Sequence, residues 1–99
     1  MVLSPEFINR IAEFVNQFVE HNIQRMNVED DEKEKKVWGY EHSFDYHYGR
    51  SIGMLIRMLR EEFRTIHERE ANPKEVIEIA ICLQQHTWKI KQSLALFKK

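Results

Sequence analysis

The sequence contains few of the residues that form disulfides and tight turns. Among its 99 residues there are one cysteine, two prolines and three glycines. The lone Cys82 excludes an internal disulfide and a metal site built from cysteine alone. Its neighbours Ile81 and Leu83 favour a small core residue over a reactive thiol. So few turn residues leave little turn chemistry for a multi-stranded sheet.

Long apolar runs and a basic excess are also missing. No stretch reaches the roughly 18 apolar residues that a membrane span needs, and no basic segment leads into an apolar run near the start. We therefore expect no membrane partner and no signal peptide. The net charge is −1 with the histidines neutral, so nucleic-acid binding would depend on a local basic patch. With its lone cysteine, the chain is expected to be intracellular and cytoplasmic.

Apolar side chains recur at helical spacing through most of the chain. Hydrophobic residues make up 42% and charged residues 31%, which is typical of one globular domain over residues 1–99. The periodicity predicts an all-α bundle of three long amphipathic helices, at about 5–26, 44–70 and 73–97.

Two of these helices begin with recognisable caps. Ser4 precedes Pro5, which suits the first position of a helix. Asn72 precedes Pro73, and Glu75 stands where its carboxylate reaches back to the cap. The run 76–83 is rich in β-branched residues and would also suit a buried strand, but the cap before it decides for a helix.

The run 76–83 is apolar on almost every side. Only Glu78 in it is polar, and a helix that is apolar all round needs cover all round. Two other helices in a monomer do not supply that cover. We therefore expect a homodimer, the commonest oligomer, with contacts to the core or to the second copy from Ile77, Ile79, Ile81 and Cys82.

The segment 28–36 reads VEDDEKEKK and has no apolar period. Its acidic residues come first and its lysines last. We expect a charged linker within the domain. The alternative is a solvated helix that glutamate–lysine pairs stabilise.

An aromatic cluster follows at 38–48, WGYEHSFDYHY. Its aromatic residues alternate with polar ones, which is typical of a half-buried strand. However, Phe44 and Tyr48 also continue the apolar stripe of the next helix, with Ser43 as its cap. We predict a helix from Phe44 and an irregular or short extended segment at 37–42.

Residues of the types that dominate protein interfaces gather in this cluster. They are Trp38, Tyr40 and Tyr46, with Arg50 just beyond. An exposed patch of this kind marks an interface more often than an active site. The alternative is that 37–42 folds back as a lid with Trp38 as a plug, or forms a dimer contact.

A row of arginines gives a second candidate surface. Arg50, Arg57, Arg60 and Arg64 share one side of the second helix, where they could follow a phosphate backbone beside aromatic rings. Glu61 and Glu68 lie four residues after two of them, as on an ordinary solvated helix face. An acidic protein partner is a further possibility.

Enzymatic chemistry finds little support. His42 and Asp45 have the spacing of two metal ligands on a helix, but there is no H-x-x-x-H or E-x-x-H pair. Carboxylate chemistry by Glu61, Glu62, Glu75 and Glu78 lacks the required spacing. We therefore expect no catalytic residue, cofactor or metal. The preferred function is a homodimer that acts by binding protein. Nucleic-acid binding through the Arg50–Arg64 face is the alternative, and a metal- or carboxylate-dependent enzyme comes third.

Overall fold

The computed structural model describes residues 3–98, which form an all-α structure without strands. The expected fold class is confirmed at that level. Its helices are α1 (Pro5–Phe18), α2 (Val28–Trp38), α3 (Ser43–His67), α4 (Pro73–Gln84) and α5 (Thr87–Ser93). A π-helical turn, η1 (Val19–Ile23), follows α1, and a 3₁₀ turn, η2 (Ala95–Phe97), follows α5. No helix within 3–98 is both long enough and apolar enough to cross a membrane.

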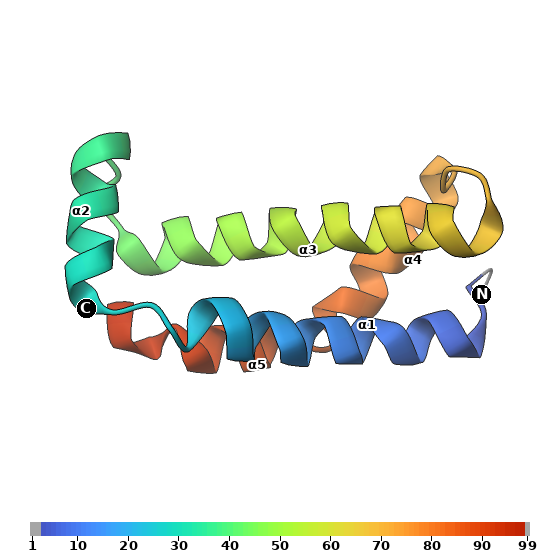
Figure 1. Cartoon of the computed structure of the whole chain (residues 1–99), viewed down its shortest axis with the longest axis horizontal. Helices are drawn as coiled ribbons and strands as arrows, with labels where there is room; N and C mark the ends of the chain where they lie inside the picture. Colours follow the sequence, from blue (N-terminus) through green and yellow to red (C-terminus); the bar gives the residue numbers. More distant parts are fainter. Residues whose placement is uncertain (1–2, 99) are drawn as a thin grey trace.

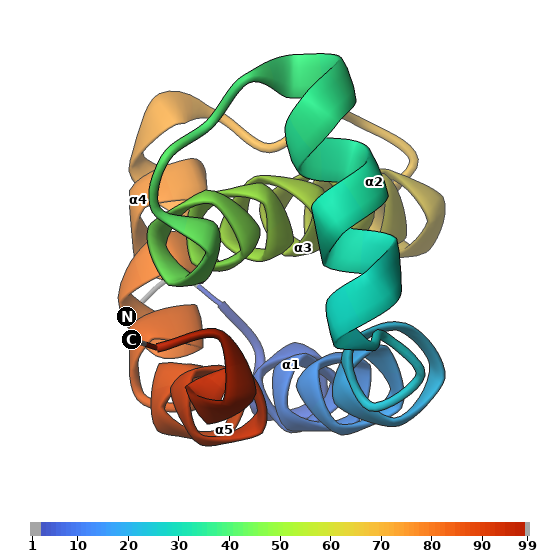
Figure 2. The same cartoon turned by 90° about the vertical axis from the view of Figure 1, so that its left-hand side faces the viewer.

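Three rods run along the long axis of the molecule, which measures 41 × 22 × 19 Å. The rods are α1, α3 and α5, and α1 and α3 run in opposite directions (Figure 1). Helix α4 crosses obliquely from the level of α3 to that of α5 (Figure 1). Helix α2 stands across one end and connects α1 with α3, as both views show (Figure 2). The chain therefore returns along the bundle twice, with α2 closing one end.

The first expected helix, 5–26, is divided. Ser4 caps α1 as predicted, because its Oγ accepts a hydrogen bond from the Phe7 amide at 3.2 Å. The α-helical pattern ends at Phe18, and the next turn widens so that the Gln24 amide bonds to the Val19 carbonyl. One long α-helix to residue 26 is thus replaced by α1 and η1.

The segment 28–36, expected as a charged linker, lies within α2. The Asn27 side chain caps its first turn by accepting from the Asp30 amide at 2.8 Å, and Gly39 ends it at a φ of +70°. Acidic residues occupy the first turn and lysines the last, which suits the helix dipole. The helical alternative therefore describes this segment, and only 39–42 of the aromatic stretch remain irregular.

The second expected helix, 44–70, corresponds to α3. Its N-cap is His42 instead of Ser43, because the Ser43 hydroxyl donates to Asp31 of α2. It ends three residues early, at His67, where Glu68 adopts a left-handed φ of 56°. A five-residue connection then leads to α4.

The third expected helix, 73–97, begins as predicted and is then broken. Asn72 and Glu75 form the predicted capping box, and Arg69 adds two hydrogen bonds to the Glu75 carboxylate. At the other end of α4, the Thr87 hydroxyl donates to the Gln84 carbonyl at 2.9 Å. That bond satisfies a carbonyl at the helix end, and α5 starts in a new direction.

The core lies between the three rods and α4. Each contributes side chains at helical spacing, so the apolar stripes expected from the sequence face one another. The fully buried apolar residues are Phe7, Ile11, Val15, Leu55, Leu59, Phe63, Ile79, Leu83, Ile90 and Leu94. The bundle therefore has one continuous core.

Candidate interaction surface on helices α3 and α4

The predicted binding residues separate into two groups in space. Tyr40, Tyr46 and Arg50 lie where α2 meets the start of α3, a region we call the corner, which also includes Asp31, Glu34, Ser43 and His47. Arg57, Arg60 and Arg64 lie further along α3. Trp38 joins neither group, because it ends α2 and is 69% exposed.

Asp31 is the centre of the corner. Its carboxylate is buried and accepts hydrogen bonds from the Tyr40 hydroxyl at 2.7 Å and the Ser43 hydroxyl at 2.8 Å. The Nε2 atom of His47, which is only 2% exposed, lies 2.7 Å from the same carboxylate. One acidic side chain thus connects α2, the turn after it and α3.

Glu34 makes a second set of contacts one helical turn later. Its Oε1 accepts from the Tyr46 hydroxyl at 3.2 Å and from the Arg50 guanidinium. The rings of Tyr40 and Tyr46 stack with their centroids 3.9 Å apart. Hydrogen bonds to α2 therefore occupy the polar groups of Tyr40, Tyr46 and Arg50 and hold α2 against α3.

The electrostatics of the corner follow from these contacts. Burial by itself raises the pKa of Asp31, but the hydrogen bonds from Tyr40, His47 and Ser43 outweigh it and lower the pKa below 3.8. Burial and the neighbouring carboxylate both raise the pKa of Tyr40. Asp31 is thus held as a carboxylate and Tyr40 as a neutral hydroxyl donor. This arrangement is a satisfied structural network.

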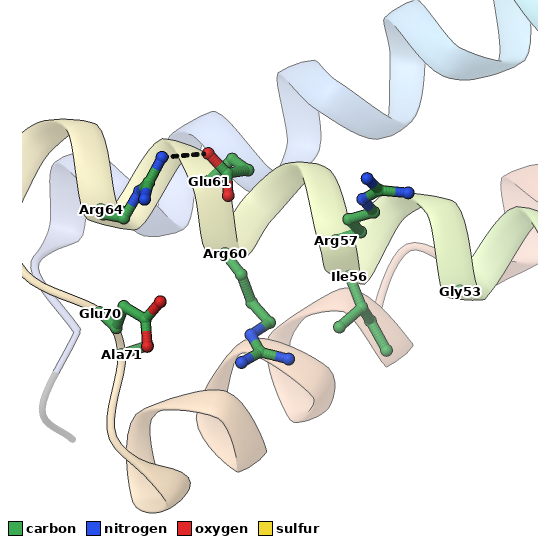
Figure 3. Close-up of a pocket in the computed structure, with 8 residues that line it drawn as sticks. All are labelled: Gly53, Ile56, Arg57, Arg60, Glu61, Arg64, Glu70 and Ala71. Atoms are coloured by element: carbon green, nitrogen blue, oxygen red, sulfur yellow. Dashed lines mark hydrogen bonds and ion pairs between the residues drawn. The ribbon is translucent and has the colours of Figure 1, made fainter.

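The remaining arginines line an open cavity of about 390 Å³ on α3, which we call the arginine cavity. Its lining residues are Gly53, Ile56, Arg57, Arg60, Glu61, Arg64, Glu70 and Ala71. Figure 3 shows Arg64 turned toward Glu61, with which it forms an ion pair at 3.1 Å. Arg60 instead extends over α4, on the same side of α3 as Ile56.

Arg57 and Arg60 form no ion pair or hydrogen bond with any residue from 3 to 98. The sequence had suggested that Glu61 would neutralise Arg57, four residues before it. The structure pairs Glu61 with Arg64 instead. Two guanidinium groups therefore remain available to a partner that brings negative charge.

An apolar groove of about 460 Å³ runs between α3 and α4 beside the arginine cavity. Its apolar lining residues are Tyr48, Ile52, Ile56, Ile77, Ala80, Ile81 and Leu83. Ile77 is 59% exposed and Ile81 is 51% exposed. Ile56 lines both the groove and the arginine cavity, so the two are continuous. We call this combined surface the α3–α4 face.

The four residues expected to make core or dimer contacts differ in burial. Ile79 and Cys82 are buried in the core of this chain, where burial raises the pKa of the Cys82 thiol. Ile77 and Ile81 face outward along the groove. The chain thus leaves apolar surface of α4 uncovered.

Gly49 and Gly53 lie along the same face. A β-carbon added at either position would meet no atom within 4 Å outside its own helix. Within this chain the space over both glycines is therefore open. A second helix could therefore approach the backbone of α3 here.

No cluster of three histidine, cysteine, aspartate or glutamate side chains within 3–98 has the geometry to hold a metal ion. His42 and Asp45, the pair with ligand spacing, lie at the exposed start of α3. His47 pairs with Asp31, sixteen residues earlier. These contacts give the histidine a structural partner.

Asp31 is the important residue that sequence reasoning did not single out. It stands in a run of acidic residues and has no periodic feature that separates it from its exposed neighbours. Its partners Ser43 and His47 are twelve and sixteen residues away. Only a prediction of the angle between α2 and α3 would have found it.

The sequence matches no family model, and no curated protein or solved structure is significantly similar to it.

Proposed function

We propose that the protein is a non-enzymatic binding protein whose α3–α4 face pairs with a second copy to form a homodimer. The observation that carries the proposal is the uncovered apolar groove, in which Ile77 and Ile81 are more than half exposed. Contiguous apolar surface of this kind marks protein interaction sites in soluble proteins.

The surrounding structure supports binding more than catalysis. The buried polar residues of the corner satisfy one another, so they leave no poised acid, base or nucleophile there. The groove has an apolar centre and a charged margin formed by Arg57 and Arg60. An apolar core with a polar rim is the usual anatomy of a protein interface.

The experiment is sedimentation equilibrium of the wild-type chain and an Ile81→Glu variant. At roughly tens of micromolar protein, a weak dimer is populated, and we expect twice the 12.0 kDa mass of one chain. Ile81→Glu should yield the monomer, because it places a charge in the apolar contact. A wild-type chain that stays monomeric at these concentrations would contradict the proposal.

Leu96 provides a matched control. It is 55% exposed, close to the value for Ile81, but it lies in η2 outside the groove. Leu96→Glu should therefore leave the dimer intact. If both substitutions weaken association equally, the contact is not specific to the groove.

Nucleic-acid binding remains a second candidate because Arg57 and Arg60 lack partners within 3–98. Contacts to phosphates release counterions, so binding should weaken as salt rises. Retention on RNA or DNA at low salt that Arg57→Glu abolishes would support this function. Absence of retention at low salt would remove it.

A further inference from the structure

One stripe of α3 combines the open glycines with unpartnered charges at both ends. Going along the helix, it carries Asp45, Gly49, Gly53, Ile56 and Arg60. At about 100° per residue these five positions fall within roughly 80° of one another. The stripe spans about 22 Å at 1.5 Å per residue.

The two charged ends are free within the chain. Asp45 and Arg60 are both exposed, and neither has an ion pair or hydrogen-bond partner for its side chain among residues 3–98. The acid lies at the start of α3 and the base more than four turns later. The stripe is therefore negative at one end, apolar in the middle and positive at the other end.

Such a stripe is complementary to itself when two copies run antiparallel. A two-fold axis between Ile52 and Gly53 places residue 45 of one copy opposite residue 60 of the other. This alignment matches Asp45 with Arg60, and the two-fold symmetry repeats the match.

Resting on the homodimer proposed above, we infer that the second copy packs its α3 antiparallel across this stripe, with Asp45 of each copy meeting Arg60 of the other. The helices cross over Gly49 and Gly53, where the open space permits close approach. Ile52 and Ile56 are then covered, as are the exposed Ile77 and Ile81 of α4 beside them.

The charges of the arginine cavity favour this occupant over a nucleic acid. Glu61 and Glu70 line the same cavity and repel a phosphate backbone. The apolar groove that continues from the cavity has no charged side chain in its lining to bind a phosphate. An antiparallel copy of α3 instead supplies apolar side chains and carboxylates in the required order.

Charge reversal tests the register. We expect Arg60→Glu and Asp45→Lys each to weaken the dimer about tenfold, because symmetry makes each substitution act twice. The double variant restores the opposite charges and should bind within about threefold of wild type. Arg25→Glu is the control, since Arg25 is exposed and lies outside α3. Circular dichroism verifies that each variant remains helical.

Crosslinking tests the axis independently of the charges. Position 53 lies beside the proposed axis, so a Gly53→Cys variant should crosslink to its mate with a short bismaleimide. Position 64 is about 34 Å from its own mate in this register, so Arg64→Cys should not crosslink. Native Cys82 is buried, and a wild-type sample measures its contribution.

The outcomes separate the two proposals. A wild-type dimer in which the double reversal fails to restore binding, or in which Arg64→Cys crosslinks as well as Gly53→Cys, overturns the register but keeps the homodimer. A monomeric wild-type chain overturns both. Retention of that monomer on RNA, lost in Arg60→Glu, would assign the arginines to nucleic acid instead.

Discussion

At the corner, Asp31 finds a partner within the chain for each carboxylate oxygen, whereas on the outer stripe of α3 Arg60 and Asp45 find none among residues 3–98. Both regions include residues of α3. Burial makes the difference, because a buried carboxylate without partners is too costly to keep, while exposed charges are solvated. The polar groups that satisfy one another within the chain therefore hold the fold, and the uncovered surface is the one for which we propose binding.

Removal of the Asp31 carboxylate at the centre of the corner should have the largest effect on stability. Asp31→Ala removes the buried carboxylate that Tyr40, Ser43 and His47 share, and Tyr40 keeps only the carbonyl of residue 31 as an acceptor. We expect the free energy of unfolding to fall by about 3 kcal/mol, measured by urea denaturation. Asp30→Ala is the matched control, because Asp30 is exposed, and it should change stability by less than about 0.5 kcal/mol. Equal effects would show that the network does not stabilise the fold.

Low pH tests a second carboxylate whose hydrogen bonds are satisfied within the chain. It belongs to Glu75, near the C-terminal end of α3. The guanidinium of Arg69 and the amide of Asn72 lower the pKa of Glu75 from 4.5 to about 2. Because the folded pKa is the lower one, this stabilisation is complete above about pH 4.5 and is lost as pH falls through about 2.

Glu75→Gln should therefore lower the melting temperature at pH 7 and reduce its decline between pH 4.5 and 2. The loss at pH 7 should be smaller than for Asp31→Ala, since the amide oxygen still accepts one hydrogen bond. Thermal melts across this pH range are the measurement. Parallel curves for wild type and variant would contradict it.

A glycine-to-alanine substitution should change the stability of the chain in opposite directions at the end of α2 and within α3. Gly39 ends α2 at a φ of +70°, so Gly39→Ala should lower the stability of the chain by about 1 kcal/mol. Gly53 lies inside α3 in open space, so Gly53→Ala should raise it by about 1 kcal/mol. Chemical denaturation at a protein concentration well below the dissociation constant of the dimer measures both effects. A loss at Gly53 would mean that the glycine serves the fold of the single chain.

The smallest effect is expected at Trp38. It is 69% exposed, so Trp38→Ala should change the free energy of unfolding by less than about 0.5 kcal/mol. Chemical denaturation of the monomer measures it. A larger loss would show that Trp38 acts as the plug that the sequence offered as an alternative.

The sequence predicted the features that depend on local or periodic information. The apolar stripe of α3 and the capping box of Asn72 and Glu75 were both accessible in this way. The break between α4 and α5 was hidden, because Leu83 and Ile90 keep their helical spacing across it. Thr87 lies between Leu83 and Ile90 at the same helical spacing and is polar. Its hydroxyl donates to the Gln84 carbonyl at the end of α4.

The predicted binding residues show the same division. Helical spacing placed Arg57, Arg60 and Arg64 along one side of α3, and the structure brings them to one cavity. The spacing also placed Arg50 in that row, but its partner Glu34 is sixteen residues away on α2. Such a pairing depends on the angle between two helices, which no periodic pattern reports.

Helix α2 has one consequence for motion in solution. Asp31 is its only buried residue, and its other side chains are half-buried or exposed. Few contacts therefore oppose the detachment of α2 from α3. Detachment would expose the Asp31 carboxylate to water without opening the core between the rods. We expect the amide hydrogens of α2 to exchange with solvent well before those of α3, through a local opening whose rate the corner sets.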